Sequence, residues 1–264
     1  MRFALGISYD GTAYHGWQKQ AEHLTLQATL ERALSQIADH AVTVTCAGRT
    51  DKGVHALGQV VHFDTQSHRT NRAWQLGTNS LLPPDIRVEW IQEVAEQFHA
   101  RFSAKARKYV YIILNQSSAS ALGHRYVMHC SEVLHVDLMQ YAADYLLGEH
   151  DFTSFRGADC QSRSTVRTVY ACKVYQRDQS FIHIEITANA FLQHMVRIIV
   201  GSLITIGTGA QEPSWMQAVL LAKDRQRAGS TAKANGLYLL DVLYRESLPK
   251  PRSICPFLRS SALF

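Results

Sequence analysis

The sequence predicts an α+β protein in which two split βαβ units, each with the order β-α-β-β-α-β, share one sheet and leave a cleft between them. Two observations lead to this prediction. Short runs of alternating apolar residues are typical of strands, and apolar stripes at helical spacing lie between these runs. The order of elements in the first half also returns in the second half, without visible repetition of sequence.

The first half begins with a strand pattern in which apolar side chains alternate from Phe3 to Tyr9. A helix with one apolar face follows, and Thr25 stands in its capping position. Pro83 and Pro84 end a second helix. The expected elements after the first strand are a helix at 26–37, strands at 42–47 and 58–63, a helix at about 72–82, and a strand at 86–90.

The second half opens with a strand, Tyr109 to Leu114, that is apolar on both faces and therefore belongs in the middle of a sheet. A polar segment, 151–167, is long for a simple connection, and such segments are usually functional or mobile. The other expected elements are a helix at 138–147, a hairpin of 169–175 with 181–186, a helix after Ala190, a helix at 215–222, and a last strand at 237–242.

Composition indicates a globular protein with a weak preference for an anionic partner. Of the 264 residues, 46% are hydrophobic and 19% are charged, and the net charge is +5. The five cysteines show neither a CxxC pair nor zinc-finger spacing, which favours a reducing compartment. The N-terminus has no secretory pattern, and the most apolar stretch, 198–207, is too short to span a bilayer. We therefore expect a soluble, cytoplasmic protein without a membrane segment.

The stretch from Cys46 to Ala56 places one carboxylate between two cations. It lies between two strand patterns, and Gly48 and Gly53 give its backbone room to bend and to approach a ligand. Arg49 and Lys52 flank Asp51, an arrangement that keeps a carboxylate ionised and attracts a polyanion. The same residues are also ordinary in an exposed hairpin turn, so the spacing alone is compatible with either a site or a solvated turn.

Two further stretches each allow two interpretations. The loop from Tyr9 to Gln20 carries Tyr14 and Trp17, which either stack on nucleic-acid bases or anchor the loop to the core. The stretch from Phe98 to Lys108 interleaves cations with aromatic residues, which suits either a solvated linker or a phosphate-lined groove.

Several classes of site are missing from the sequence. There is no HExxH motif, no EF-hand loop and no cysteine-histidine finger, and the glycines do not form a phosphate loop or a dinucleotide fingerprint. No nucleophile-elbow signature is present either. What remains is a carboxylate in a basic setting.

Five stretches, in matching order from Phe3 to about Tyr244, closely resemble the bacterial tRNA pseudouridine synthase I family. They are Tyr9 to Gln18, Gly48 to Ala56, Arg107 to Tyr111, Asn189 to Arg197, and Gly236 to Leu239. The resemblance implies the pseudouridine synthase fold, with two ferredoxin-like halves around a central antiparallel sheet. It also implies conversion of uridine to pseudouridine at positions 38, 39 and 40 of the tRNA anticodon arm, by a homodimer that needs no cofactor and no metal. The expected domains are 1–104, which carries the catalytic loop, and 105–246, followed by a variable tail at 247–264.

Residue by residue, the resemblance implies a catalytic Asp51, an active-site Tyr109 and an Arg197 that pairs with Asp51. Leu237 corresponds to a leucine that lines the pocket, and Arg49 to a basic residue that handles the RNA. From their charge and position, we also expect phosphate contacts from Arg101, Lys105 and Arg107.

Two other functions are compatible with part of the pattern. A non-catalytic RNA-binding or chaperone protein would share the basic charge and the aromatic loops. A hydrolase with Asp51 as nucleophile would need a metal or phosphate site, for which the sequence gives no sign.

Overall fold

A computed structural model describes residues 1–250 of the chain. Of the tail predicted at 247–264, the part from 251 onward lies outside the described residues. The chain divides into two compact units. Unit 1 contains Met1–Arg107 and the segment that starts at Tyr238, and unit 2 contains Lys108–Leu237. The domain boundaries expected from the sequence stay a prediction.

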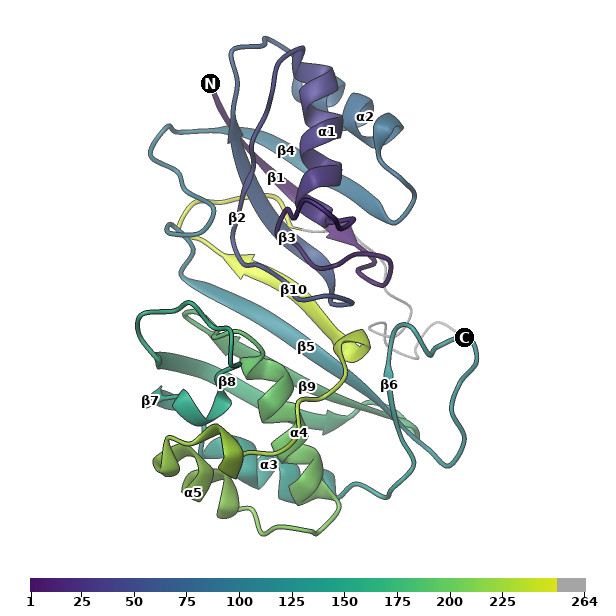
Figure 1. The fold of residues 1–264 in the computed structure, drawn as a ribbon, viewed down its shortest axis with the longest axis vertical. Helices are drawn as coiled ribbons and strands as arrows, with labels where there is room; N and C mark the ends of the chain where they lie inside the picture. The colour runs from purple at the N-terminus through teal and green to yellow at the C-terminus, as the bar shows by residue number, and fades with distance from the viewer. Residues whose placement is uncertain (251–264) are drawn as a thin grey trace. The chain divides into compact units, whose positions relative to one another are not determined.

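Unit 1 has the predicted order β-α-β-β-α-β (Figure 1). Its strands lie in the order β4-β1-β3-β10, with the short β2 paired to β3. Helices α1 and α2 pack against each other, and α2 packs against β4. The elements are β1 (Arg2–Tyr9), α1 (Leu26–Ala38), β2 (Thr45–Cys46), β3 (His55–Asp64), α2 (Asn71–Leu81), β4 (Ile86–Val94) and β10 (Leu237–Leu243).

Most strand pairs in unit 1 are antiparallel, but β10 runs parallel to β3. The register places Tyr238 opposite His55 and Leu239 opposite Ala56. Parallel neighbours require a long connection, and here all of unit 2 separates the two strands in the chain. The pairing therefore holds the start of β10 beside the first residues of β3, directly after the Asp51 loop.

The core of unit 1 is centred on Trp74, which α2 places against the sheet. Trp74 is fully buried, and its ring lies 5.9 Å from the ring of Phe3 and 5.2 Å from that of Phe63. Phe3 and Phe63 face each other across the β1–β3 pair at 5.8 Å. The alternation of apolar residues in β1 and β3 thus supplies the surface that α2 covers.

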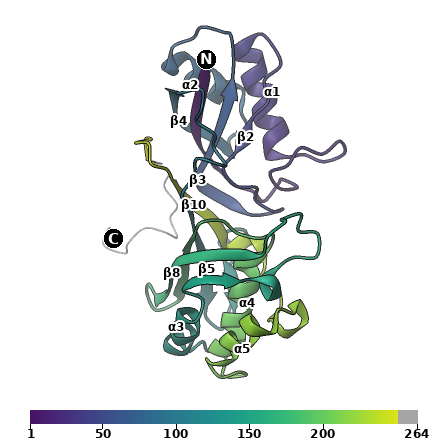
Figure 2. The same ribbon diagram turned by 90° about the vertical axis from the view of Figure 1, so that its left-hand side faces the viewer.

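In unit 2 the strands lie in the order β5-β9-β8-β7, and the short β6 runs parallel to β5. Helices α3, α4 and α5 pack against one another, and α3 also packs against β8 (Figure 2). The elements are β5 (Ala106–Asn115), β6 (Met128–Cys130), α3 (Val136–Asp144), β7 (Gly148–Asp151), β8 (Val166–Gln176), β9 (Phe181–Ala188), α4 (Met195–Gly207) and α5 (Trp215–Ala222), with short 3-10 turns at Thr153–Phe155, Arg225–Arg227 and Ala234–Gly236.

The predicted long elements of unit 2 are present, and two short strands were not predicted. The residues from Tyr109 to Leu114 are all buried, which confirms a strand that is apolar on both faces. The apolar stripe of α4 is buried from Met195 to Ile206, and only Arg197, Ile204 and Thr205 of this helix are half-buried. Strands β6 and β7 have only three and four residues, too few for an alternating pattern to show in the sequence.

The α+β class is confirmed, whereas the predicted cleft between the halves stays a prediction. Within residues 1–250, no helix combines the length and the apolar character needed to cross a membrane.

Trp74 and Leu76 provide a test of the core, because they lie on the same helix with opposite exposure. Replacing the buried Trp74 by Ala should lower the free energy of unfolding by about 3–5 kcal/mol, since it removes a large side chain and leaves a cavity. Leu76 is 56% exposed, and Leu76→Ala should change stability by no more than about 0.5 kcal/mol. Urea unfolding followed by circular dichroism measures both. Equal losses for the two variants would show that Trp74 is not central to the core.

Candidate active site

The Asp51 loop, Ala47–Val54, joins β2 to β3 within unit 1. Bonds to β3 fix its first residues. The Ala47 backbone N–H donates to the Val60 carbonyl at 2.8 Å, and the Gln59 side-chain amide donates to the Gly48 carbonyl at 2.6 Å. Gln59 is completely buried, so the protein shields this bond from competing water. The loop therefore leaves the sheet in a defined direction.

Thr50 carries most of the contacts that hold the middle of the loop. The Trp17 backbone N–H donates to the Thr50 carbonyl at 2.9 Å, and the hydroxyl oxygens of Thr50 and Tyr9 lie 2.8 Å apart. The Val54 N–H donates to the Asp51 carbonyl at 3.1 Å and closes a turn. Thr50 is buried, whereas Asp51 is half-buried. The backbone on both sides of the Asp51 side chain is thus fixed while the residue itself stays accessible.

Two glycines allow the loop from Tyr9 to Gln20 to approach this closely. A Cβ at Gly16 would lie 2.9 Å from the Thr50 carbonyl oxygen, and Gly16 also has a φ of +85°, which other residues rarely adopt. A Cβ at Gly11 would lie 2.0 Å from the Val54 carbonyl oxygen. Any side chain at either position would push the two loops apart.

The structure decides between the two interpretations of Tyr14 and Trp17. Both are buried, with 2% and 1% of their surface exposed, and the Tyr14 hydroxyl donates to Asp85 Oδ1 at 2.7 Å. Trp17 packs against Tyr9, with ring centroids 6.1 Å apart. These aromatic residues anchor the loop to the core and are not surfaces for stacking bases.

His55, to which the sequence assigned no role, holds the end of the Asp51 loop. It is 2% exposed, and its Nδ1 lies 3.1 Å from both the Gly11 backbone nitrogen and Asp10 Oδ1. Its ring stacks on Tyr238 of β10 at 4.8 Å. Burial raises the pKa of Asp10, but hydrogen bonds from His55 and Thr12 outweigh it and hold that pKa well below its usual range. An ionised Asp10 thus helps to clamp His55 in place.

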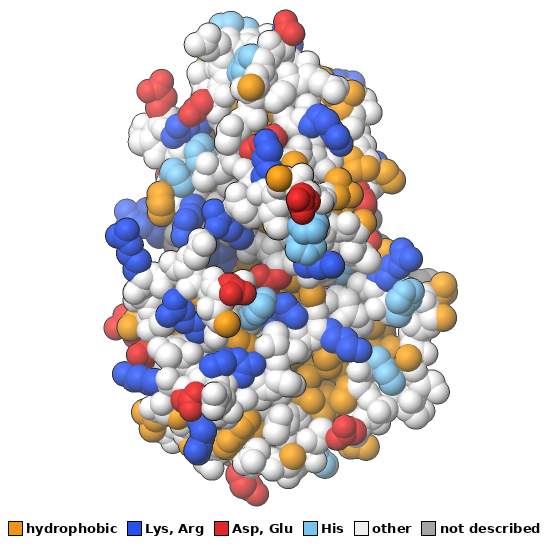
Figure 3. All heavy atoms as spheres, in the orientation of Figure 1, with side chains coloured by type: hydrophobic (Ala, Val, Ile, Leu, Met, Phe, Trp, Pro, Cys, Tyr) orange, Lys and Arg blue, Asp and Glu red, His pale blue; other side chains and the backbone are white. Residues whose placement is uncertain are grey.

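Three of the predicted RNA-binding cations, Arg49, Arg101 and Lys105, are exposed. All three belong to unit 1. Lys and Arg side chains gather over the loop that joins β4 to β5, the part of the chain that carries Arg101 and Lys105 (Figure 3). Exposed cations in such a group are suited to contact phosphates.

Arg107 has a different setting from the other predicted cations. It is only 7% exposed, and its guanidinium donates to the carbonyls of Ala47 (2.9 and 3.3 Å), Arg101 (2.6 Å) and Ala104 (3.4 Å). The bond to Ala47 ties Arg107 to the first residue of the Asp51 loop, within unit 1. The geometry thus favours a role in positioning this loop over a direct phosphate contact.

Arg197 lies in the first turn of α4 and is half-buried. Its Nε donates to the Ala232 carbonyl at 2.8 Å, and the Ala232 N–H donates to the Arg197 carbonyl at 3.0 Å. These two bonds fix the plane of the guanidinium relative to the segment 232–236.

The segment 232–236 is in turn anchored to the sheet and leads directly to Leu237. The hydroxyl of the buried Tyr111 donates to the Lys233 carbonyl at 2.7 Å. The Asn235 side-chain amide donates to the carbonyls of His124 and Val127 at 2.7 and 2.8 Å. Burial raises the pKa of Tyr111 above its usual range, so its hydroxyl stays protonated and able to donate. Tyr111 thus supports Arg197 through one short segment of backbone.

Tyr109 and Leu237, the other site residues expected in unit 2, are nearly covered, with 7% and 5% of their surface exposed. The Tyr109 ring packs edge to face on Phe191, with centroids 5.0 Å apart. Next to it, Lys108 Nζ forms an ion pair with Glu185 Oε2 at 2.6 Å. Unit 2 thus holds the Tyr109 ring against Phe191 and the Lys108 ammonium against Glu185.

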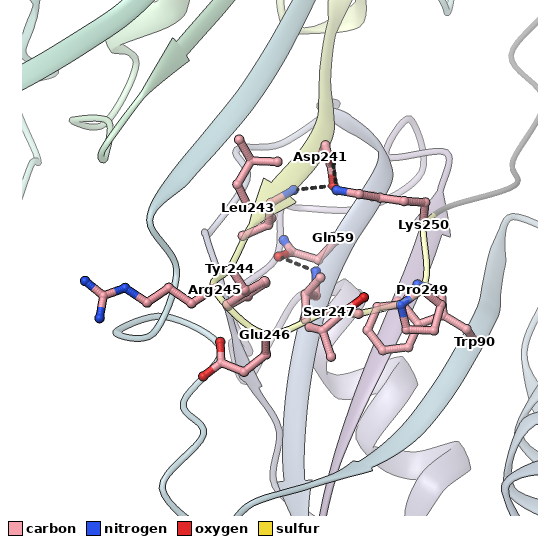
Figure 4. Close-up of a pocket in the computed structure, with 15 residues that line it drawn as sticks. Gln59, Trp90, Asp241, Leu243, Tyr244, Arg245, Glu246, Ser247, Pro249 and Lys250 are labelled. Atoms are coloured by element: carbon pink, nitrogen blue, oxygen red, sulfur yellow. Dashed lines mark hydrogen bonds and ion pairs between the residues drawn. The ribbon is translucent and has the colours of Figure 1, made fainter.

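A separate hollow of about 320 Å³ lies in unit 1 (Figure 4). Gln59, Trp90, Asp241 and Tyr244 contribute to its wall, and Lys250 Nζ pairs with Asp241 Oδ2 at 2.7 Å. None of the predicted site residues lines it. Within residues 1–250, no group of three His, Cys, Asp or Glu side chains is placed to hold a metal ion.

A family model described as tRNA pseudouridine synthase matches residues 6–103 and 142–245 of the chain. The matched residues include Arg49, Asp51, Arg101, Arg197 and Leu237, whereas Lys105, Arg107 and Tyr109 lie between the two matched parts.

Curated relatives named tRNA pseudouridine synthase A match almost the whole chain. The protein of Colwellia psychrerythraea is 53% identical over 253 residues, which cover 96% of this chain and 97% of the relative. The protein of Aeromonas salmonicida is 54% identical, over 96% of this chain and 93% of the relative. The protein of Coxiella burnetii is 51% identical, over 95% of this chain and 96% of the relative.

Among solved structures, the crystal structure of the archaeal box H/ACA sRNP Nop10-Cbf5 complex aligns with 76% of this chain and 44% of that chain. Its TM-score of 0.34 and identity of 10% are too low to bear on fold or function.

The close approach at Gly16 can be tested against Gly209, which has a similar φ of +77° but no atom within 4 Å of an added Cβ. Gly209→Ala should lower the free energy of unfolding by about 1 kcal/mol, the cost of a left-handed conformation. Gly16→Ala should lower it by at least ~1 kcal/mol more, because the Thr50 carbonyl must also move. Urea unfolding of both variants measures the difference. Equal losses would show that the contact between the loops is loose.

Proposed function

The chain belongs to the tRNA pseudouridine synthase family, and we propose that it converts uridine to pseudouridine at positions 38, 39 and 40 of the tRNA anticodon stem-loop. It is an isomerase that acts on tRNA, as relatives with more than half of their residues in common are named for this activity. The observation that carries the proposal is the Asp51 loop, which offers an accessible carboxylate on a backbone held by buried partners.

The reaction breaks the bond from uracil N1 to ribose C1′, turns the base, and joins C1′ to C5. Nothing is added or removed overall, so the protein needs a group that attacks or deprotonates, a clamp for the released base, and exclusion of water. The target uridine is stacked or paired in the anticodon arm and must first be extruded, which costs a few kcal/mol.

Asp51 supplies the group that attacks or deprotonates. Attack on ribose C1′, attack on the uracil ring and removal of a ribose proton all require the same ionised carboxylate. The fixed backbone at Thr50 and Val54 supports this role, because a reacting group must be held in one position for efficient chemistry.

Arg197 pairs with Asp51 in this proposal. A dry pocket disfavours the charged form of a carboxylate, and an arginine bound through two parallel hydrogen bonds counters this effect. The bond from Arg197 Nε to the Ala232 carbonyl supports the proposal, because it fixes the plane in which the guanidinium presents its remaining N–H groups.

Tyr109 and Leu237 complete the proposed pocket. The Tyr109 ring stacks on the extruded uracil, a contact worth about 1–3 kcal/mol, and its hydroxyl relays the C5 proton. The edge-to-face packing on Phe191 supports this role by holding the ring in one orientation. Leu237 closes the apolar side of the pocket, and its position directly after the anchored segment 232–236 supports this role.

The remaining proposals concern the RNA and the assembly. Arg49, Arg101 and Lys105 contact tRNA phosphates, and their exposure supports this role. Arg107 acts mainly by holding Ala47, the first residue of the Asp51 loop. On the family resemblance, we also propose a cytoplasmic homodimer in which both subunits contact one tRNA.

Asp51→Asn should abolish release of tritium from tRNA labelled at uridine C5, with a loss of at least ~10⁴-fold, because the amide cannot act as nucleophile or base. The affinity for tRNA should change little. Asp137→Asn, which alters an exposed carboxylate of α3, is the control and should keep full activity. Substantial tritium release by Asp51→Asn would overturn the catalytic role of Asp51.

Arg197→Met should lower kcat by roughly 10²-fold or more while Kd for tRNA changes much less, because the pairing acts on the reacting carboxylate. Arg197→Lys keeps the charge but loses the planar fork, so its kcat should lie between those of Met and Arg. Lys173→Met, which removes an exposed cation of unit 2, controls for the change in net charge. A kcat for Arg197→Met equal to that of the parent would show that the pairing is absent or dispensable.

A further inference from the structure

Phe102 is an exposed aromatic residue in a turn that several hydrogen bonds hold. Its side chain is 74% exposed, the highest value among the exposed aromatic residues that the structure describes. It lies in unit 1, between β4 and β5, and the proposed reaction does not use it. A single exposed aromatic residue is ordinary on a protein surface, so the setting of Phe102 has to decide whether it binds a ligand.

Hydrogen bonds fix the backbone beneath Phe102. His99 Nδ1 accepts from the backbone N–H groups of Arg101 and Phe102, both at 3.2 Å. The Ser103 N–H donates to the His99 carbonyl at 2.8 Å, and the His99 N–H donates to Ser103 Oγ at 3.0 Å. Burial and the nearby charge of Arg2 lower the pKa of His99, so its ring is neutral at pH 7 and its Nδ1 can accept. The turn thus holds Phe102 outward without covering it.

The ring of Phe102 ends a short row of tilted rings that starts inside unit 1. The centroids of His62 and His99 lie 4.7 Å apart, and those of His99 and Phe102 lie 4.3 Å apart. His62 is buried and accepts from the Ala100 N–H through Nδ1 at 3.1 Å. The outermost ring, Phe102, thus contacts His99 and the Arg101 guanidinium and remains mostly exposed to solvent.

The surroundings of Phe102 are basic. The Arg101 guanidinium carbon lies 5.5 Å from the ring centroid, and Lys105 is exposed three residues further along. The sequence contains no Asp or Glu between Glu96 and Glu132. Figure 3 shows that Lys and Arg side chains gather over this β4–β5 loop. An aromatic face beside cations fits a nucleic-acid strand, whose bases stack while its phosphates bind the cations.

The turn lies close to Ala47, the first residue of the Asp51 loop, because the Arg107 guanidinium donates to both the Arg101 and Ala47 carbonyls, but it lies far from Asp51 itself. His55 begins β3 next to the Asp51 loop, and His62, which contacts the turn, stands seven residues later on that strand. At about 3.3 Å per residue, these two ends of β3 are roughly 20–25 Å apart. A base on Phe102 therefore belongs to a nucleotide other than the uridine that reacts at Asp51.

We propose that Phe102 is a stacking platform for an unpaired base of the tRNA outside the catalytic pocket, and that Arg101 and Lys105 bind the adjoining phosphates. This inference rests on the proposed function, because it takes tRNA as the ligand. The platform strengthens the binding of tRNA and places it for reaction, while the chemical step depends on Asp51.

Variants of Phe102 separate stacking from simple apolar contact. Phe102→Ala and Phe102→Leu should raise Kd for tRNA about fivefold to tenfold, the loss expected for one stacked base, and Phe102→Trp should restore binding. Binding is measured with an unmodified tRNA transcript in the Asp51→Asn background, where no turnover occurs. Tyr170→Ala, which removes another exposed aromatic residue, is the control and should bind as the parent does.

Steady-state kinetics and the oligomeric state of the variants show whether Phe102 acts through tRNA binding. In the parent background, Phe102→Leu should raise KM with little change in kcat. Three results would each overturn the platform. Phe102→Leu could keep the Kd and KM of the parent, or Phe102→Trp could fail to restore binding. The Phe102 variants could also change the oligomeric state of the protein while their affinity for tRNA stays that of the parent. Lack of tritium release by the parent chain would instead overturn the proposed function, and the binding measurements would still decide the role of Phe102.

Discussion

The hydrogen bond from the Trp17 backbone N–H to the Thr50 carbonyl holds two loops so close together that no side chain fits between them at Gly16. The conformation of Asp51 depends on this contact, because Thr50 is the residue immediately before it. Trp17 is in turn fixed by its own burial in the core. The position of the Asp51 carboxylate thus derives from apolar packing several residues away, which a polar loop on its own could not supply.

Unit 2 fixes Arg197 by the same means, a backbone carbonyl. Ala232 accepts from Arg197 Nε, and Tyr111 anchors the neighbouring Lys233. A carbonyl satisfies one N–H of a guanidinium without neutralising its charge, which a carboxylate in the same place would do. The arrangement therefore orients Arg197 and keeps its positive charge available for an anionic partner such as the proposed Asp51.

Periodicity predicted the long elements well, because α1, β1, β5 and α4 each bury one or both faces in a regular pattern. It could not find β6 and β7, which are too short for any pattern to show. The role of His55 was also hidden, since it depends on Asp10, Gly11 and Tyr238. Tyr238 is brought beside His55 only by a parallel pairing across most of the chain, and local spacing contains no information about that pairing. Tyr14 and Trp17 remained ambiguous for a similar reason, because exposure is a tertiary property.

Arg101 and Arg107 show most clearly why spacing alone cannot assign a cation. Both stand in one basic run, yet Arg107 is buried on three backbone carbonyls and Arg101 is exposed beside Phe102. A guanidinium that leaves water must find acceptors for its N–H groups, so the burial of Arg107 requires the carbonyls that it holds. Arg107 therefore serves the shape of the Asp51 loop. The exposed members of the run, Arg101 and Lys105, are the ones suited to contact a polyanion, because within residues 1–250 no backbone carbonyl has replaced their hydration.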